Sequence, residues 1–265
     1  MIEQEIIISL NTRVAPDTFL MGFRSPEIAG EAKPGQFVML RVRRGIDPLL
    51  RRPFSICGIG ENDLVYIVYR VVGKGTAIMS QTGKGEKLSV MGPLGTGFTF
   101  PRIDQTPLLV AGGMGIAPLL FLARAMKIRD MVFLAGFASS RQIIDPDQIG
   151  HSSIDISLAT DDGSRGYSGT VTDYLAEYLH NQETGRDSIT IYSCGPLPML
   201  KKAASTAADF DLPCQVSLET VMACGLGACQ GCAIKVLSTE GQLSYRHVCK
   251  DGPVFSSSII DWNCL

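Results

Sequence analysis

Four of the eight cysteines in this chain lie close together near its C-terminal end, and this cluster constrains the fold more than any other feature. They are Cys224, Cys229, Cys232 and Cys249. The N-terminal residues are acidic where a secretory signal peptide would be basic, so we expect a cytoplasmic protein. Because disulfide bonds are rare in the cytoplasm, closely spaced cysteines there indicate a metal site.

The spacing of these cysteines indicates the kind of metal centre. Four residues separate Cys224 from Cys229, and two separate Cys229 from Cys232. A [2Fe–2S] cluster takes four thiolates, and C-x4-C-x2-C with a more distant fourth cysteine is one of the spacings that such clusters use. Glycines between the cysteines let the loop wrap closely round a cluster and point backbone N–H groups at its sulfurs.

A zinc site is the alternative interpretation of the same cysteines. Zinc usually takes two C-x2-C pairs or a mixture of cysteine and histidine. This chain has one such pair, and the gap of four residues before Cys229 is unusual for zinc. We interpret His247 as a bystander. The spacing therefore favours an iron–sulfur cluster, with Cys249 as its fourth ligand.

The overall composition argues against several classes of protein. The formal net charge is -2 and no basic stripe is visible, so we expect no nucleic-acid partner. Residues 107–123 carry no charge, but a membrane span needs about 20 apolar residues without a glycine cluster, so we expect a strand, a glycine turn and a helix there. No nucleophile–histidine arrangement suggests hydrolysis, and we predict no catalytic acid, base or nucleophile. We expect Cys57, Cys214 and Cys264 to be small buried thiols.

The N-terminal part has the pattern of an antiparallel β-barrel or sandwich. Apolar, β-branched and aromatic stretches at residues 5–9, 36–42, 64–72 and 87–91 are separated by glycine and proline clusters. Many short strands with turn signals between them are typical of a barrel. We therefore predict a β-barrel domain over residues 1–101.

From residue 102 the pattern changes to strands that alternate with helices. The expected strands cover residues 108–111, 131–136, 154–159 and 188–193, and the expected helices cover 118–127, 171–180 and 196–210. This alternation predicts an α/β domain with a parallel sheet over residues 102–212. Residues 213–265, with one expected strand at 233–237, are too few to build much core alone, so we expect the metal centre to hold this module together.

Two stretches of the barrel region suit a ligand that has both a phosphate and an aromatic ring. In the run Arg-Arg-Pro-Phe-Ser-Ile (51–56), Arg52 can neutralise a pyrophosphate, Phe54 can face a ring and Ser55 can bond a ring nitrogen. Glycines up to Gly75 precede a helix expected at 77–81 with Thr76 as its N-cap, and a helix N-terminus attracts anions. An exposed arginine on an edge strand and an ordinary capped helix are the alternatives.

Two further loops suggest a nucleotide site in the α/β domain. The run Gly-Gly-Met-Gly (112–115) lies between an expected strand and helix, although Pro118 breaks the dinucleotide fingerprint G-x-G-x-x-G/A. The run Cys-Gly-Pro (194–196) also ends a strand and opens a helix. Ligands of parallel sheets bind at the carboxyl ends of the strands, so both loops can line one crevice. Tight strand–helix packing without a ligand is the alternative.

Taken in order, these motifs resemble the ferredoxin–NADP reductase superfamily. A short cluster module after the nucleotide domain resembles, more narrowly, the electron-transfer subunits of class 1B dihydroorotate dehydrogenase. The matching runs are Arg-Arg-Pro-Phe-Ser-Ile (51–56), Tyr-Arg-Val-Val-Gly-Lys-Gly-Thr (69–76), Thr-Asp-Asp-Gly-Ser (160–164) and Cys-Lys-Asp-Gly-Pro-Val-Phe (249–255). The resemblance covers nearly the full length of the chain.

The resemblance implies three redox groups and their binding residues. FAD would lie on the barrel near Arg52, Pro53, Phe54, Ser55, Val68, Tyr69, Arg70, Gly75 and Thr76. NAD, as substrate, would enter a crevice near Gly112, Gly113, Gly115, Ile116, Ala117, Cys194, Gly195 and Pro196. The [2Fe–2S] cluster would be held by Cys224, Cys229, Cys232 and Cys249. The implied partner is an FMN-containing catalytic subunit that oxidises dihydroorotate in pyrimidine synthesis, in a heterotetramer of two copies of each subunit.

The implied groups form a consistent relay, because a flavin exchanges two electrons with a nicotinamide and single electrons with a cluster. Related assemblies share this layout and stay as alternatives. They are the small subunit of a bifurcating NADH-dependent ferredoxin–NADP oxidoreductase, sulfide dehydrogenases and some hydrogenase subunits. A self-contained reductase and a non-enzymatic metal-binding module are further alternatives.

The choice between NAD and NADP depends on two loops. Arg141, in the run Ser-Ser-Arg (139–141), is a candidate partner for the 2′-phosphate of NADP, although we favour a solvated loop arginine there. Asp161 or Asp162 is a candidate partner for a ribose hydroxyl of NAD. The resembled family favours NAD.

Overall fold

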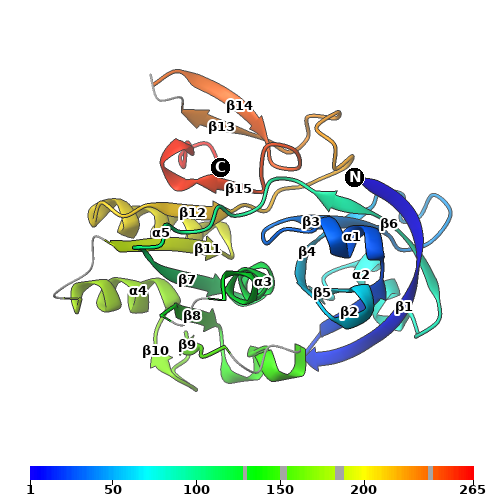
Figure 1. The fold of residues 1–265 in the computed structure, drawn as a ribbon, viewed down its shortest axis with the longest axis horizontal. Coiled ribbons are helices and arrows are strands. Elements are labelled where there is room, and N and C mark those ends of the chain that lie inside the picture. Colours follow the sequence, from blue (N-terminus) through cyan, green and yellow to red (C-terminus); the bar gives the residue numbers. More distant parts are fainter. Residues whose placement is uncertain (128–129, 150–153, 183–187, 238–240) are drawn as a thin grey trace.

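Three structural parts make up the protein in this computed structural model, which describes residues 1–127, 130–149, 154–182, 188–237 and 241–265. A closed barrel lies beside a seven-stranded sheet, and a two-stranded hairpin forms a third, smaller part near the C-terminus (Figure 1). The predicted fold class, a β-barrel followed by a parallel-sheet α/β domain and a small C-terminal module, is confirmed.

The barrel is antiparallel throughout, with the strand order β1-β2-β5-β4-β3-β6. Its strands are β1 (Ile2–Ala15), β2 (Thr18–Arg24), β3 (Phe37–Arg41), β4 (Arg52–Ile59), β5 (Leu64–Arg70) and β6 (Lys87–Leu94). The connections hold helices α1 (Pro26–Glu31) and α2 (Lys74–Gln81) and the turn η1 (Glu61–Asp63). The sequence did not predict β2 or β4, so the arginine-proline-phenylalanine-serine motif, expected after a strand and a loop, is itself a strand.

The sheet of the second part has the strand order β10-β9-β8-β7-β11-β12-β15. The strands are β7 (Thr106–Gly112), β8 (Val132–Phe137), β9 (Ser157–Thr160), β10 (Tyr167–Ser168), β11 (Ile189–Cys194), β12 (Cys214–Ser217) and β15 (Val254–Ser256). Neighbouring strands are parallel except β12 and β15. The chain winds outward from β7 through β8 and later returns to β11, so the strand order reverses between β7 and β11, where such sheets bind ligands.

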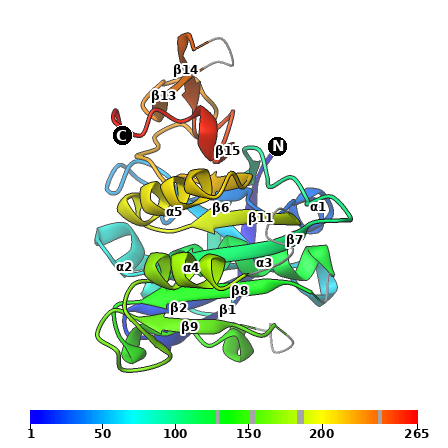
Figure 2. The ribbon, with the colours of Figure 1, turned by 90° about the vertical axis from the view of Figure 1, so that its left-hand side faces the viewer.

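Helices cover both faces of this sheet. Helix α3 (Ile116–Met126) packs between the sheet and β4 of the barrel, while α4 (Val171–His180) and α5 (Leu197–Asp209) lie side by side on the other face (Figure 2). Short turns η2 (Gly113–Gly115), η3 (Ser140–Gln142), η4 (Pro146–Ile149) and η6 (Ser257–Ile259) complete the part. The uncharged stretch 107–123 forms β7, η2 and α3, as expected, and no helix within the described ranges is long and apolar enough to cross a membrane.

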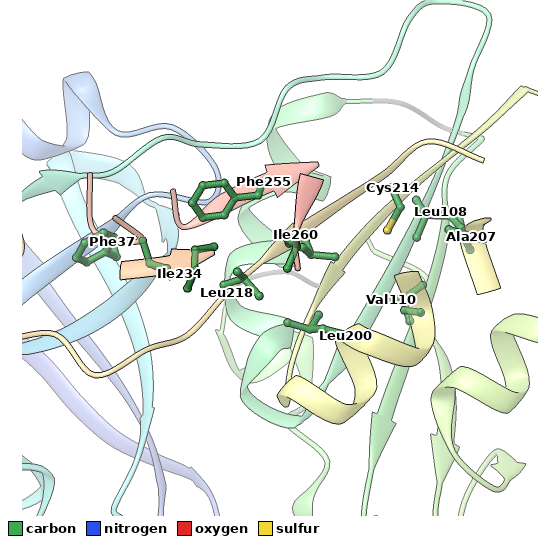
Figure 3. Packing of buried hydrophobic residues seen from close by; sticks show 14 of the residues in the cluster. Phe37, Leu108, Val110, Leu200, Ala207, Cys214, Leu218, Ile234, Phe255 and Ile260 are labelled. Carbon is green, nitrogen blue, oxygen red and sulfur yellow. The ribbon is translucent and has the colours of Figure 1, made fainter. Parts of the chain in front are cut away.

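The C-terminal hairpin, β13 (Ala233–Leu237) and β14 (Leu243–His247), does not stand alone. Ile234 and Ile260 join Leu218 and Phe255 in one buried cluster with Leu200 of α5 (Figure 3). Strands β12 and β15, which fall within the expected module 213–265, extend the sheet of the second part. A shared apolar core therefore helps to hold this module in place. The domain boundary at residue 212 stays a prediction, and the seven-stranded sheet continues across it.

Asn11 of β1 fastens helix α2 to the barrel. Its amide donates to the backbone oxygens of Met79, at 2.7 Å, and Thr82, at 2.9 Å. Its Oδ1 accepts a hydrogen bond from the Tyr69 hydroxyl at 3.0 Å. Burial raises the pKa of Tyr69 to about 12, so the hydroxyl keeps its proton at neutral pH. One side chain thus satisfies the C-terminal end of α2 and positions an aromatic ring on β5.

We expect Asn11→Ala to lower the free energy of unfolding by about 2 kcal/mol, because three partly buried partners lose a hydrogen bond. Urea unfolding followed by circular dichroism measures this change. Asn263→Ala, at an exposed position near the C-terminus, is the control and should stay within about 0.5 kcal/mol of the parent protein. Equal stability of the two variants would contradict the role assigned to Asn11.

Candidate redox and nucleotide sites

A cavity of about 250 Å³ lies where the barrel, the sheet and the C-terminal part meet. The barrel contributes Phe37, Pro53, Phe54, Ser55, Val68, Tyr69, Arg70 and Val72. The second part contributes Met114 and Ala117, and the end of β12 with the chain after it contributes Ser217, Leu218, Glu219, Thr220, Met222 and Pro253. Phe54 and Tyr69 meet edge to face at a centroid distance of 5.8 Å, so two aromatic rings border the cavity. We refer to it as the barrel pocket.

Arg52 and the start of α2 come together at the barrel surface. The Arg52 side chain lies so close to Gly75 that a Cβ at Gly75 would overlap it, and its guanidinium donates to the backbone oxygen of Leu50. A cation and a helix N-terminus therefore share one corner, as a phosphate group requires. Arg51, by contrast, pairs with Glu3 and donates to Ser89, which makes it a structural link between strands.

The predicted N-cap of α2 was wrong. The helix begins at Lys74, and Gly73, in an extended conformation, is the N-cap. Thr76 occupies the third helical position, where its Oγ1 accepts hydrogen bonds from the backbone N–H groups of Val72, at 2.9 Å, and Gly73, at 3.2 Å. The glycines give the chain room to start the helix earlier, and the threonine closes the turn from inside, as in a capping box.

Two polar groups on the chain after β12 face the barrel pocket. Thr220 Oγ1 is buried and has no hydrogen-bond partner among the described residues, so a bound ligand could satisfy it. Glu219 keeps contact with solvent, but the protein atoms around its carboxyl raise its pKa. The pocket thus combines apolar walls with a few polar atoms, which is the usual make-up of a cofactor site.

A second cavity, of about 470 Å³, lies at the carboxyl edge of the sheet where the strand order reverses. Residues at or after the carboxyl ends of five strands, β7 to β11, line it together with Arg70 of the barrel: Gly112, Gly113, Gly136, Phe137, Ala138, Gln142, Asp161, Thr170, Val171, Thr172, Pro196, Pro198 and Met199. Gly113 has φ +52° and no atom within 4 Å of where a Cβ would be, so its backbone is open to a ligand. Arg70 also lines the barrel pocket, so the two cavities adjoin. We refer to this cavity as the sheet pocket.

The remaining residues of the two glycine motifs have different positions. A Cβ at Gly115 would overlap the backbone oxygen of Cys194, so this glycine permits the close packing of two loops. Ile116 and Cys194 are buried in the core, while Ala117 lines the barrel pocket and not the sheet pocket. A Cβ at Gly195 would meet Met199 Sδ at 2.8 Å, which again indicates packing.

The four clustered cysteines come together in pairs and share hydrogen bonds with the loop. Cys232 Sγ lies 3.2 Å from Cys249 Sγ, and the Gly227 N–H donates to Cys249 Sγ at 3.0 Å. Cys224 Sγ accepts from the N–H groups of Leu226, at 3.3 Å, and Cys229, at 3.4 Å. Within the described ranges no three cysteine, histidine or acidic side chains converge enough to hold one metal ion. A two-iron cluster divides its ligands between two irons, so paired thiols suit it.

The surroundings of two of these thiols shift their pKa values in opposite directions. Burial acts to raise the pKa of Cys224, but hydrogen bonds from the N–H groups of Leu226 and Cys229 outweigh it and lower the pKa to about 6. Burial, together with the neighbouring Cys232 thiol, raises the pKa of Cys249 to about 12. Backbone N–H groups that stabilise a thiolate are equally suited to cluster sulfurs.

The cysteine loop packs directly on the barrel. Gly225 has φ +73°, and a Cβ there would lie 3.0 Å from Met39 Cγ of β3 and 3.2 Å from Met91 Cε of β6. Met222, which precedes Cys224 by two positions, lines the barrel pocket. The wall of that pocket and the first cluster cysteine are therefore parts of one short segment.

The other cysteines and the described histidines lie outside these sites. Cys57 and Cys214 are buried, as expected, and burial raises the pKa of each to about 12. The expectation that Cys264 is buried was wrong: it is exposed near the end of the chain, where Lys235 donates to its sulfur at 3.6 Å. His247 lies 3.6 Å from Asp251, and His151 lies outside the described residues.

Several residues of these pockets were not predicted as site residues. Met114, Glu219, Thr220 and Met222 form the wall opposite the barrel, and Gln142, Thr170 and Thr172 line the sheet pocket. The only signal in the sequence was adjacency to a motif, such as Met222 shortly before the first cluster cysteine.

The barrel, the sheet and the two adjoining pockets define a protein of the ferredoxin-reductase class. The structure of an NADH-dependent reduced ferredoxin-NADP oxidoreductase is similar with a TM-score of 0.83 and 31% identity, covering 97% of this chain and 90% of that one. Phthalate dioxygenase reductase is similar in fold, with a TM-score of 0.63 and 17% identity over 94% of this chain and 77% of that one.

Sequence relatives narrow this class to a family. The dihydroorotate dehydrogenase B (NAD(+)) electron transfer subunit of Desulforamulus reducens is 42% identical over 94% of both chains, and that of Fusobacterium nucleatum is 37% identical over 97% of this chain and 98% of that one. Residues 219–261 match the iron-sulfur cluster binding domain of dihydroorotate dehydrogenase B. The chain belongs to the family of dihydroorotate dehydrogenase B electron transfer subunits, which confirms the resemblance seen in the sequence.

Proposed function

We propose that this chain relays electrons between NAD and an FMN-containing subunit that oxidises dihydroorotate, through FAD and a [2Fe–2S] cluster. The observation that carries the proposal is the contiguity of three sites. Arg70 lines both pockets, and Met222 connects the barrel pocket to the cysteine loop. A nicotinamide site, a flavin site and a cluster site in this order form the sequence that a two-electron to one-electron relay requires.

In this proposal the barrel pocket holds the flavin ring, and Arg52 with the start of α2 holds the pyrophosphate. Pro53, Phe54 and Ser55 of β4 and Val68 and Tyr69 of β5 supply the walls, and Thr76 keeps the first turn of α2 closed. The fit is supported by the Thr220 hydroxyl, which has no hydrogen-bond partner among the described residues, and by the close approach of the Arg52 side chain to Gly75 at the start of α2. When bound, FAD supplies the exchange of electron pairs for single electrons.

The proposed cluster ligands are Cys224, Cys229, Cys232 and Cys249. The fit is supported by the donor set, four thiols with backbone N–H groups directed at two of them. The loop between Cys224 and Cys229 packs against the barrel through Gly225. This packing would keep the cluster next to the barrel pocket and exclude water from that side. Cys229 is exposed, and we place the exit of electrons to the partner on this side.

The nucleotide would bind in the sheet pocket, with Gly112 and Gly113 beside its phosphates and Pro196 on the opposite loop. Gly115, Ile116, Cys194 and Gly195 support these loops from behind, and Ala117 contacts the flavin side. The chain contributes orientation and exclusion of water to hydride transfer, and the base needed for dihydroorotate oxidation belongs to the partner. We propose a heterotetramer with two copies of each subunit, located in the cytoplasm, where thiols stay reduced.

The test uses the full chain purified without oxygen. We expect flavin absorption bands that bleach on addition of NADH, together with bound iron and acid-labile sulfide. NADH should reduce artificial dyes, whereas dihydroorotate should have no effect until the FMN-containing subunit is added. A colourless protein that contains zinc would overturn the proposal.

A second candidate function is a subunit of a ferredoxin–NADP oxidoreductase, which the 31% identical structure favours. The same preparation distinguishes the two functions. Reduction of the chain by dihydroorotate through its co-expressed partner supports the first, and reduction only by ferredoxin or NADPH through its partner supports the second.

A further inference from the structure

We propose that Asp161 makes the sheet pocket selective for NAD over NADP, and that the loop 139–141 after β8 is not available to a 2′-phosphate. This inference rests on the proposed function, because it assigns selectivity within the proposed nucleotide site. It assigns the preference to one residue, whereas the sequence left Asp161 and Asp162 as alternative partners of the ribose and Arg141 as a candidate partner of a 2′-phosphate.

The structure places Asp161 in the pocket and Arg141 outside it. Asp161 follows β9 and lines the cavity that also contains Gly113 after β7 and Gln142 after β8. Arg141 is exposed and is not part of the cavity wall. An elongated nucleotide whose phosphates lie at Gly113 therefore reaches Asp161 at the far side of β8, since β7, β8 and β9 are consecutive parallel strands.

The charge of the pocket wall also favours NAD over NADP. Within the described part of the chain, Arg70 and Asp161 are the charged residues that line this cavity, and Arg70 lies at the end shared with the barrel pocket. Away from Arg70 the wall thus carries one carboxylate and no cation. A carboxylate accepts a hydrogen bond from a ribose 2′-hydroxyl, whereas a 2′-phosphate carries close to two negative charges at neutral pH and is repelled.

The loop after β8 is already occupied by protein groups. The Ser140 N–H, which would be a natural donor to a phosphate, donates instead to Ser164 Oγ at 2.7 Å. The Ser164 N–H donates in turn to Asp162 Oδ1 at 3.0 Å. Hydrogen bonds from the Ser164 hydroxyl and N–H lower the pKa of Asp162, so this carboxylate stays charged beside the loop. A 2′-phosphate would have to displace Ser164 and lie next to a second negative charge.

The experiment measures equilibrium binding of NAD⁺ and NADP⁺ to the oxidised full-length protein with its flavin, by isothermal titration calorimetry. We expect the parent protein to bind NAD⁺ at least about tenfold more tightly than NADP⁺. Asp161→Asn keeps the shape and removes the charge, so NADP⁺ binding should tighten by about tenfold relative to NAD⁺. Asp161→Glu keeps the charge and should keep the preference for NAD⁺.

Asp209→Asn is the matched control, because it removes the same charge at the other end of α5, whose first residues border the pocket. It should leave both affinities unchanged, and the flavin spectrum reports that each variant is folded. An unchanged NAD⁺ to NADP⁺ ratio in Asp161→Asn, or equal affinities in the parent protein, would overturn the role of Asp161 while leaving the nucleotide site in place. Binding of neither nucleotide by the parent protein would overturn the proposed function itself.

Discussion

Replacing Cys229 by serine is expected to remove the iron–sulfur cluster and to leave the flavin bound. A serine oxygen is a poor substitute for a thiolate in such a cluster, and three thiols cannot complete the two-iron ligand set. Electron transfer from NADH to the FMN-containing partner should fall by roughly 100-fold or more. Reduction of artificial dyes by NADH should stay within about twofold of the parent protein, because it needs only the two pockets.

The measurements are iron and acid-labile sulfide content, the visible spectrum and the two activities. Cys264→Ser is the matched control, since Cys264 is also exposed, lies in the same module and belongs to no cluster spacing. It should retain iron, sulfide and both activities. Full iron content in Cys229→Ser would show that the ligand set is different from the one proposed.

The cluster variant should also stay folded, which follows from the structure and not from the sequence. Ile234, Val236 and Ile260 of the C-terminal part are buried together with Leu200 and Val216 of the second part. Burial of apolar surface stabilises this part by about 25 cal/mol per Å² whether or not iron is present. Loss of the cluster is therefore expected to loosen the cysteine loop without unfolding the chain.

Gly115→Ala is expected to lower the free energy of unfolding by about 3 kcal/mol, although the change adds a single methyl group. The new Cβ would overlap the backbone oxygen and carbon of Cys194 and lie 2.7 Å from the backbone nitrogen of Gly195. Backbone atoms cannot rotate away as a flexible side chain can, so the loops after β7 and β11 must separate. Because both loops border the sheet pocket, NAD⁺ binding should weaken by about tenfold or more.

Chemical denaturation and NAD⁺ titration check the two effects separately. Gly30→Ala is the control, because no atom lies within 4 Å of where its Cβ would be and it sits within helix α1. It should be neutral or slightly stabilising, by up to about 1 kcal/mol. If Gly115→Ala proved as stable as Gly30→Ala, the close approach of the two loops would not exist in solution.

Most of the architecture could be predicted because its signals are local. Apolar residues four positions apart, Val171, Leu175 and Leu179, are typical of the helix that α4 forms at Val171–His180, and the glycine run after β7 predicted the turn between that strand and α3. Strands β2 and β4 escaped prediction because both contain residues typical of turns, Gly22 in β2 and Pro53 and Gly58 in β4. Strands β12 and β15 escaped because each is short and gains its stability from neighbours distant in the sequence.

The candidate sites likewise include some residues that the sequence could predict and others that it could not. The four candidate cluster cysteines could be proposed from the sequence because a metal centre prescribes the type, number and spacing of its ligands within a short segment. Asn11, which joins α2 to Tyr69, carried no signal, since an asparagine in a strand indicates nothing until its partners are known. Thr76 was predicted in the right helix turn but in the wrong capping role, because several residues near a helix start can supply the oxygen.

By itself the sequence determined the classes of domain, their order and the chemistry of the cluster, because these are encoded in spacings of a few residues. Only the tertiary structure decided which loops meet. It brought Met222 to the barrel pocket, placed Asp161 and not Arg141 in the sheet pocket, and gave the C-terminal part a core shared with α5. The physical reason is that such contacts depend on how apolar faces far apart in the chain pack together, and no local pattern records that outcome.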